Sequence, residues 1–322
     1  MFKVAMLSGW HVHAAGYARQ LNGIEGCAVA YVWDEDAARG EAWAKELDVP
    51  FVADLDELLA KKDYQGVIVS TPTTMHEDVI TKAAKAKKHI FTEKALATNV
   101  AACKRIAAAV REGGVEFCIS YPYRVMPMYL YAKDLMDKGL LGDVSLMRMR
   151  NGHDGSLAGW LPPYWYDKSL TGGGALMDLG CHPCYLADWL LGAPAKVSAA
   201  MTFDTGRETD DTAVCMAEFK NGAVAILETS LMTPYSPGIL ELYGTKGSMR
   251  AVGDRVEVRL SDSPGWFVPP ALPKAQAMPM DQWIDGIKTG KRHPFDLDAA
   301  TRLTALLEAA YTSHETGKPF VF

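Results

Sequence analysis

The sequence predicts an α/β Rossmann domain followed by an α+β domain with a largely antiparallel, open sheet. Short apolar runs alternate with helical patterns as far as about residue 120, and strand-like runs dominate after it. The chain has 322 residues, 49% of them hydrophobic, which exceeds one ordinary domain of about 100–200 residues. We therefore expect two domains, one over residues 1–120 and the other over residues 121–322.

The first half has the strand–helix alternation of right-handed βαβ units, which build a parallel sheet covered on both faces. The apolar run 66–70, with Val-Ile-Val at its centre, is typical of a fully buried strand. We expect strands over 2–7, 28–33, 66–70, 89–92 and 116–120, and helices over 14–21, 37–47, 54–60, 78–86 and 100–111.

The second half begins with a helix over 128–138 and a Gly/Pro/Trp-rich stretch, and a second helix is expected over 177–191. Alternating patterns then predict strands over 197–203, 213–219, 223–231 and 238–243. An amphipathic helix over 298–314 follows, with Gly317 and Pro319 as stop signals. Strands that follow one another in this way favour an antiparallel sheet.

Composition excludes several classes of partner. The chain carries 33 basic and 39 acidic residues, a formal charge of −6, with no basic block, so neither nucleic acid nor an acidic membrane is an expected partner. No apolar run approaches the roughly 20 residues that span a bilayer, and the N-terminus lacks a signal-peptide core. Six cysteines without framework spacing indicate free thiols. We expect a cytoplasmic protein.

The turn after the first strand is a candidate dinucleotide site, because a pyrophosphate can bind there at a helix N-terminus. It contains Ser8, Gly9, Trp10, His11 and His13. The G-x-G-x-x-G pattern is absent, since only Gly9 lies in the tight part of the turn, so the motif alone is weak. Its position after the first strand is the stronger argument.

Asp34 ends the second strand, where a carboxylate accepts hydrogen bonds from ribose hydroxyls and repels a 2′-phosphate. NAD is therefore expected rather than NADP, although Asp34 alone also fits an ordinary turn residue. His11 and His13 could form a metal pair, but two imidazoles fall short of the about three or four ligands that zinc needs. We expect no metal.

Two further loops are expected at the carboxyl ends of strands, where open α/β sheets bind ligands. The first carries Ser70, Thr71, Pro72 and His76, and its hydroxyls and amides would face the cofactor crevice. The second carries Glu93 and Lys94, and the Lys94 ammonium would stabilise a developing alkoxide.

Asp178 and His182 stand four residues apart, which on a helix places both side chains on one face. A carboxylate there can orient the imidazole and make it a general base. Each residue taken alone also fits a structural role, a solvated lysine for Lys94 and a core histidine for His182. Cys181 and Cys184 beside His182 do not make a zinc site, because neighbours one and three apart on a helix cannot all face one ion.

These motifs resemble those of the Gfo/Idh/MocA family of glucose-fructose oxidoreductase and inositol dehydrogenase-like enzymes, over essentially the whole chain. Glu93-Lys94-Ala95 is similar to the family's Glu-Lys-Pro, and the segment from Gly172 to His182 matches its Gly-Gly-Gly-x-x-x-Asp-x-Gly-x-His stretch. Thr71-Pro72 and the tail from Ser313 to Pro319 also match. The resemblance implies that Lys94, Asp178 and His182 are catalytic and that the second-domain sheet forms a homodimer or homotetramer.

The chain departs from the family pattern at three places. The glycine turn is degenerate, Ala95 stands where Pro is usual, and Tyr185 stands where a second Asp usually follows the His by three residues. That Asp commonly contacts a sugar hydroxyl in relatives, so the departure at Tyr185 bears on the substrate.

Residues with flat rings or hydrogen-bonding edges precede the Gly-rich segment and suit a sugar ring, although each taken singly also fits core packing. Arg124 and His153 are the preferred substrate contacts. The full set of predicted substrate residues is Tyr121, Arg124, His153, Trp160, Trp165, Asp178, His182 and Tyr185.

The sequence thus predicts an NAD-dependent oxidoreductase that transfers hydride between nicotinamide and a sugar, cyclic polyol or sugar-derivative hydroxyl or ketone. His182, oriented by Asp178, would remove the hydroxyl proton while Lys94 stabilises the alkoxide. Two alternatives stay open. One is an NAD-dependent glycoside-cleaving enzyme that uses transient oxidation, and the other is a non-catalytic, dinucleotide-dependent sensor.

Overall fold

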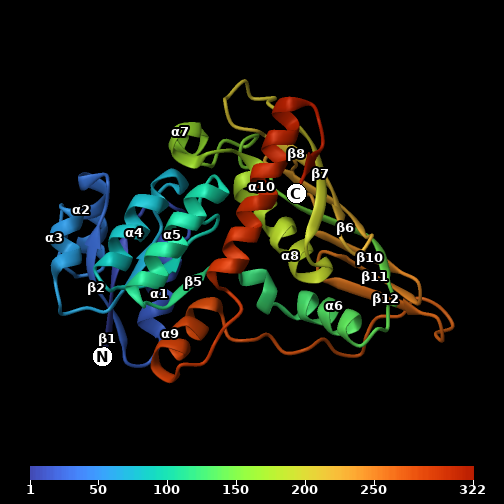
Figure 1. The fold of residues 1–322 in the computed structure, drawn as a ribbon, viewed down its shortest axis with the longest axis horizontal. Helices are drawn as coiled ribbons and strands as arrows, with labels where there is room; N and C mark the ends of the chain where they lie inside the picture. The colour runs from blue at the N-terminus through green and yellow to red at the C-terminus, as the bar shows by residue number, and fades with distance from the viewer. The chain divides into compact units, whose positions relative to one another are not determined.

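The computed structural model describes all residues from Met1 to Phe322, and the chain divides into two units (Figure 1). Unit 1 contains Met1–Ser120 and Ala277–Thr304, and unit 2 contains Tyr121–Gln276 and Ala305–Phe322. The segment Ala277–Thr304 therefore belongs with the Rossmann domain, whereas the sequence analysis assigned it to the second domain. The reason is apolar burial: Trp283 is completely buried, and its ring packs against Phe2 and Phe91 at centroid distances of 6.0 and 5.8 Å.

Unit 1 has a five-stranded parallel sheet in the order β2-β1-β3-β4-β5. The order reverses between β1 and β3, which makes the carboxyl ends of these two strands the topological switch point. The strands are β1 (Phe2–Leu7), β2 (Cys27–Trp33), β3 (Gly66–Val69), β4 (His89–Thr92) and β5 (Phe117–Ile119).

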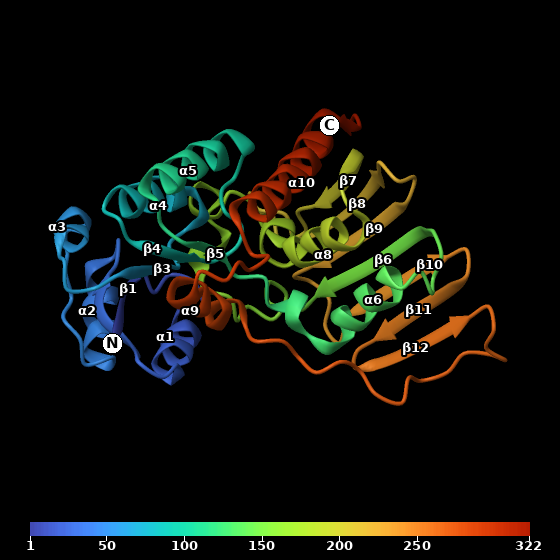
Figure 2. The same cartoon turned by 60° about the horizontal axis from the view of Figure 1, so that its bottom comes forward.

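Helices cover both faces of this sheet, with α4 and α5 on one face and α1 and α9 on the other (Figure 2). Side chains at three N-caps satisfy the first free amides: Asp36 accepts from Arg39, Asp54 from Glu57 and Asn99 from Ala102. The helices are α1 (Ala14–Gly23), α2 (Ala37–Glu46), α3 (Leu55–Ala60), α4 (His76–Lys85), α5 (Val100–Gly113) and α9 (Pro279–Thr289).

Unit 2 has an eight-stranded sheet in the order β12-β11-β10-β6-β9-β8-β7-β13. All neighbours are antiparallel except β6 and β9, which run parallel, so the expected antiparallel character is confirmed. The strands are β6 (Val144–Gly152), β7 (Pro194–Thr202), β8 (Thr212–Phe219), β9 (Val224–Ser230), β10 (Ile239–Gly244), β11 (Gly247–Val252), β12 (Arg255–Leu260) and β13 (Phe320–Val321).

Helices α6 (Pro127–Asp137) and α8 (Cys181–Leu191) lie on one face of that sheet and leave the other face without a helix (Figure 1). The short α7 (Lys168–Thr171) precedes the Gly-rich segment, and α10 (Leu297–Thr316) crosses the division between the units. The expected helix over 177–191 is not uniform, because Leu176–Gly180 forms a π-helical turn that leads into α8.

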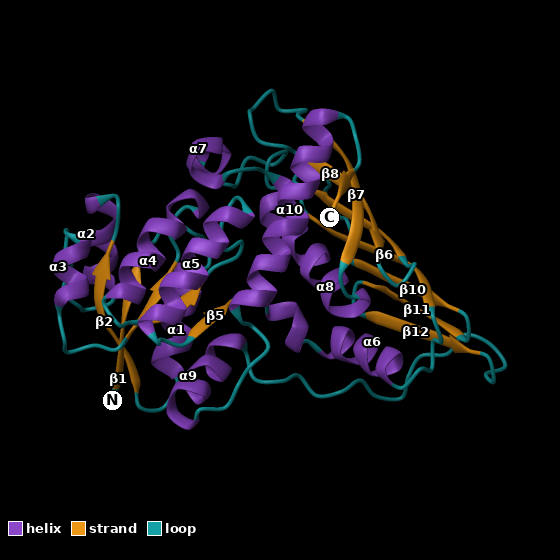
Figure 3. Cartoon of the chain, viewed as in Figure 1, coloured by secondary structure: helices purple, strands orange, loops and turns teal.

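Several elements were absent from the sequence prediction: β6, β11, β12 and α9. The chain between β12 and α9 is a long loop (Figure 3) with one bridge, Val258 to Phe267. No helix has both the length and the hydropathy that a membrane crossing requires.

Candidate functional site

The predicted cofactor turn lies at the switch point of unit 1. Ser8 follows β1 directly, and its amide donates to the carbonyl of Trp33 at the end of β2 (2.7 Å). The amide of His11 donates to the carbonyl of Ser70, the residue after β3 (3.2 Å). Ser8 has a φ of 75°, in the left-handed region that favours glycine, and such backbone conformations cluster at ligand-binding sites.

Asp34 is buried at the end of β2 and faces this turn. Its carboxylate accepts from the amide of Gly9 (2.8 Å) and from both Nε and a terminal nitrogen of Arg39 (2.9 and 2.5 Å). Arg39 also pairs with Glu35 at 2.6 Å. Two carboxylates thus neutralise the one guanidinium, so it supplies little net positive charge for a 2′-phosphate, which fits NAD.

The residues of the switch point fit a bound dinucleotide. The hydroxyls of Ser70 and Thr71 are buried and have no hydrogen-bond partner, although such groups are nearly always satisfied. A Cβ on Gly9 would lie 3.2 Å from the indole of Trp43, so the turn stays narrow only with glycine there. Orphaned hydroxyls beside a glycine turn are what a phosphate or ribose ligand would satisfy.

Glu93, directly after β4, is the centre of a buried polar cluster. Its carboxylate accepts from the Tyr17 hydroxyl and from the backbone amide of Lys94 (3.0 Å), and it lies 3.1 Å from Nδ1 of His13. Burial acts to raise the pKa of Glu93. The imidazoles of His11 and His13 prevail, helped by Lys94, and hold that pKa well below its usual range.

His11 and His13 therefore have a third neighbour that the sequence analysis did not pair with them. Ligand atoms of His11, His13 and Glu93 all lie within 4.8 Å of one another, close enough for a metal site. However, Nδ1 of His11 already accepts from the amide of His13 (3.2 Å), and the Glu93 oxygen near both histidines accepts from Tyr17. The three side chains therefore also take part in hydrogen bonds inside the protein.

Lys94 and His76 meet at the loop after β4. The Nζ of Lys94 is 4.0 Å from Oε1 of Glu93, and the Lys94–Ala95 peptide bond is cis. His76 is fully buried, and its ring nitrogens face the carbonyl oxygens of Ala95 (3.0 Å) and Thr71 (3.1 Å). Burial lowers the pKa of His76. His76, predicted as a cofactor contact, ties the loop after β3 to the loop that carries Lys94.

The Gly-rich segment of unit 2 is held by a buried carboxylate that the sequence analysis missed. Asp210 accepts from the amides of Gly174 (2.7 Å) and Leu176 (2.8 Å) and from the hydroxyl of Tyr311 (2.8 Å). A Cβ on Gly174 would lie 2.1 Å from the carbonyl oxygen of Asp210, and one on Gly173 would lie 2.0 Å from the Tyr311 hydroxyl. Gly174 is therefore required by the close approach of the Asp210 backbone, and Gly173 by the close approach of the Tyr311 side chain.

This anchored segment continues into the π-helical turn that carries Asp178 and then into α8 with His182. Single π-turns within helices are frequent at functional sites. The ring of His182 stacks on Tyr123 at a centroid distance of 4.4 Å, and its Nδ1 lies 2.9 Å from the hydroxyl of Tyr185. Tyr185 thus contacts Nδ1 of His182, a contact that the sequence analysis did not predict.

Most of the other predicted substrate residues lie in the same unit, and they differ in accessibility. Tyr121 and Trp165 are buried, and Tyr121 stacks on Tyr185 at 4.2 Å. Arg124 lies over the ring of Trp189 at 5.0 Å. His153 contacts Trp160 (4.7 Å between centroids), whose indole is 55% exposed. Tyr121, Trp165 and Tyr185 therefore shape the site from within and present almost no surface to a ligand.

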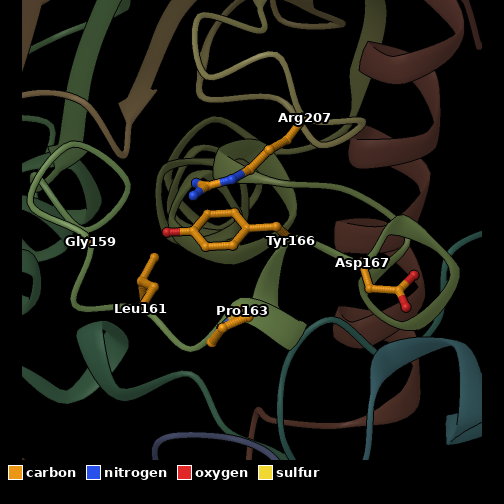
Figure 4. Close-up of a pocket in the computed structure, with 6 residues that line it drawn as sticks. All are labelled: Gly159, Leu161, Pro163, Tyr166, Asp167 and Arg207. Carbon is orange, nitrogen blue, oxygen red and sulfur yellow. The ribbon is translucent and has the colours of Figure 1, made fainter.

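A separate pocket of unit 2 lies beneath Arg207, whose guanidinium stacks 3.5 Å above the ring of Tyr166 (Figure 4). Its volume is about 410 Å³. Neither Arg207 nor Tyr166 was singled out from the sequence, and no predicted substrate residue lines this pocket. The lining residues are Gly159, Leu161, Pro163, Tyr166, Asp167 and Arg207.

Comparison with known proteins identifies the family of both domains. Residues 7–121 match the family model described as an oxidoreductase family with an NAD-binding Rossmann fold, and residues 129–250 match the GFO/IDH/MocA C-terminal domain. The oxidoreductase YrbE of Bacillus subtilis is 26% identical, over 94% of this chain and 92% of the relative. The scyllo-inositol 2-dehydrogenase (NAD+) of the same organism is 30% identical, over 70% of this chain and 66% of the relative.

Solved structures agree as well. GenD2 from gentamicin A biosynthesis, in complex with NAD, superposes with a TM-score of 0.85 at 26% identity, over 100% of this chain and 96% of that one. Both domains match family models. The Gly-rich segment of unit 2 and the switch point of unit 1, which fits a dinucleotide, are consistent with the same family. This chain belongs to the Gfo/Idh/MocA family of NAD-binding oxidoreductases.

Proposed function

We propose that the protein is an NAD-dependent dehydrogenase that interconverts a secondary hydroxyl and a ketone on a sugar, cyclic polyol or sugar derivative. The observation that carries this proposal is the match to an NAD-binding oxidoreductase domain in a chain that retains Lys94, Asp178 and His182. The relative named scyllo-inositol 2-dehydrogenase acts on a cyclic polyol, and another is named levoglucosan dehydrogenase, which supports a substrate of this class.

The residues of unit 1 hold the dinucleotide in this proposal. Asp34 accepts from the adenosine ribose, and Gly9 lets the backbone approach the pyrophosphate. Ser70 and Thr71 supply hydroxyls that the protein itself leaves unbonded. When bound, the nicotinamide accepts or returns a hydride at C4.

The residues that act on the substrate hydroxyl are Lys94 and His182. In this proposal each would supply a hydrogen bond to a reacting oxygen and so stabilise negative charge on it. The proton leaves the oxygen as the hydride leaves the carbon, so one of these two groups accepts it. Asp178, in the π-helical turn, contributes negative charge to the same segment.

The test is NADH formation by the purified protein with a panel of inositols, aldoses, anhydrosugars and sugar acids. We expect at least one to reduce NAD, with a slower rate when the reacting carbon carries deuterium. Lys94→Ala and His182→Ala should each lower kcat by about 10²–10⁴-fold while the affinity for NAD stays within a few-fold. Absence of NADH formation across the panel, with NAD bound, would overturn the proposal.

We further propose that a second copy of the chain covers the helix-free face of the unit 2 sheet. Exposed apolar side chains gather on this sheet: Leu146 on β6 and Val214 and Met216 on β8 are 38%, 41% and 43% exposed. Light scattering is expected to give a dimer or tetramer, and Met216→Lys should shift it toward the monomer. The six cysteines are buried free thiols, which supports a reducing compartment such as the cytoplasm.

A further inference from the structure

Tyr185 occupies the position from which the imidazole of His182 is oriented. Its hydroxyl lies 2.9 Å from Nδ1 of His182, and it accepts from the backbone amide of Tyr123 at 3.2 Å. The side chain is 2% exposed, so water does not complete its hydrogen bonds. The two contacts together therefore decide where its proton points.

The donors and acceptors at the Tyr185 hydroxyl favour one arrangement. The backbone amide of Tyr123 can only donate, so the Tyr185 oxygen accepts that hydrogen bond. The hydroxyl proton of Tyr185 is then available for a different acceptor. Nδ1 of His182 is the acceptor that the structure provides. The opposite arrangement, with the proton on Nδ1, would leave the phenol proton buried and unbonded, which is unfavourable.

Two features keep this arrangement fixed. Burial raises the pKa of Tyr185 well above its ordinary value, so the phenol retains its proton and remains a donor. Aromatic stacking holds both rings: Tyr121 lies on Tyr185 at 4.2 Å, and Tyr123 lies on His182 at 4.4 Å. Rotation of either ring would break a stacked contact as well as the hydrogen bond.

We propose that Tyr185 is a positioning residue that holds His182 neutral with its proton on Nε2, so that His182 donates a hydrogen bond to the reacting oxygen and does not accept its proton. An imidazole that already carries a proton on Nε2 cannot take another there without becoming an imidazolium, and that form again strands the phenol proton. A neutral histidine that polarises a carbonyl in this way is an established catalytic device.

This assignment rests on the proposed function for its consequence, which concerns the second titratable group. Oxidation would begin once Lys94 has released its resting proton to solvent: the C–H hydride would leave for the nicotinamide, and the hydroxyl proton would move to Nζ of Lys94, which becomes an ammonium again. Reduction returns both along the same path. With a phenol at position 185, His182 therefore stabilises the charge on the reacting oxygen, and Lys94 exchanges the hydroxyl proton.

The decisive measurement needs no substrate. Protein labelled with ¹⁵N-histidine is examined near neutral pH by long-range ¹H–¹⁵N correlation, with the His182 signals assigned by their absence in His182→Gln. We expect Nδ1 at an unprotonated shift and Nε2 at a protonated one. A protonated Nδ1, alone or together with Nε2, would overturn the assignment even if the enzyme proves to be an active dehydrogenase.

Variants then test whether Tyr185 is responsible for the position of the proton on His182. Tyr185→Phe removes the hydroxyl and should mix the two tautomers, while Tyr129→Phe, which removes a hydroxyl from the same aromatic stack, should leave the spectrum unchanged. Tyr129 stacks on Tyr123 at 5.3 Å and has no bond to the imidazole. Unchanged His182 shifts in folded Tyr185→Phe would remove Tyr185 from the proposal.

Kinetics separate a donor from a base once a substrate is known. Glutamine supplies an N–H donor but no base, so His182→Gln should retain at least tenfold more kcat than His182→Ala. Lys94→Arg keeps the positive charge but does not exchange a proton near neutral pH, so its kcat should fall at least a hundredfold. Equal losses for the glutamine and alanine variants would show that His182 is the base. Failure of every substrate would instead count against the proposed function and leave the tautomer result standing.

Discussion

Both units bury carboxylates beside their sites, but they neutralise them in different ways. In unit 1, Glu93 is matched by imidazoles and an ammonium, and Asp34 by a guanidinium. In unit 2, Asp210 is matched by two backbone amides and a phenol, all of them neutral donors. The first unit therefore holds its acids with charged groups, and those around Glu93 include imidazoles, which respond to pH. The second unit holds Asp210 only by hydrogen bonds from neutral groups.

The largest expected effect comes from removing the charge at the centre of the unit 1 cluster. Glu93→Gln leaves the imidazoles and Lys94 without their counter-ion in a buried place, so the free energy of unfolding should fall by about 3–5 kcal/mol. Urea denaturation measures it. The matched control is Glu77→Gln, which breaks the exposed pair with Arg105 and should change stability little. Equal losses in the two variants would contradict the comparison.

Protonation of Glu93 at low pH should remove the stabilisation that its carboxylate provides. The folded pKa of Glu93 lies below the value of about 4.3 for an unfolded glutamate. The unfolded chain therefore takes up the proton first as the pH falls, and stability present above that pH is lost below it. As the pH falls below 5, the free energy of unfolding should decrease more for the wild type than for Glu93→Gln. The midpoints of urea denaturation at each pH measure this difference. Parallel pH profiles for the two proteins would be the contrary result.

Geometry, not charge, should decide the outcome in unit 2. Gly174→Ala places a methyl group against the backbone of Asp210, which has no room to retreat, so stability should fall by about 1–3 kcal/mol at any ionic strength. Thermal unfolding in low and high salt measures this. Gly23→Ala is the control, because a Cβ there meets no atom within 4 Å. A stable Gly174→Ala protein would mean that the contact with Asp210 relaxes freely.

The smallest effect concerns cofactor choice. Asp34→Ala removes a ribose acceptor and frees Arg39 from its main partner, so the ratio of kcat/KM for NADP to that for NAD should rise about tenfold, or about 1.4 kcal/mol. Steady-state kinetics with both cofactors checks it. Lys45→Ala, near the end of α2 and without a carboxylate contact, serves as a control that should leave the ratio unchanged. An unaltered ratio in Asp34→Ala would show that Arg39 is not the determinant.

Much of the fold could be predicted from the sequence, because the alternation in unit 1 is regular and its strands are short apolar runs. Strand β6 was missed although it lies at the centre of its sheet. Its Arg148 and Arg150 suggest a solvated segment, but both pair with Glu228 on the neighbouring strand at 2.7 Å. Charged residues that pair across strands interrupt the apolar alternation along the segment, so the strand is not predicted from its own sequence.

The candidate site could be predicted in its residue types but not in its long-range contacts. Lys94 and His182 stand out as chemical groups, whereas Tyr17 and Asp210 enter the candidate site only through partners distant in sequence. Tyr185 was recognised as a departure from the family pattern. Its contact with His182 joins residues three apart within α8, a spacing that makes side chains neighbours on a helix, so this contact could have been predicted.

The return of Ala277–Thr304 to unit 1 has a consequence for how the protein is made. During translation the Rossmann strands leave the ribosome long before α9 exists, and Trp283 is the side chain that packs against Phe2, Phe91 and Gly66. Until some nine-tenths of the chain has been synthesised, the nascent sheet keeps this apolar area uncovered. The domain that begins first is thus completed almost last, and in that interval it is a natural client for chaperones.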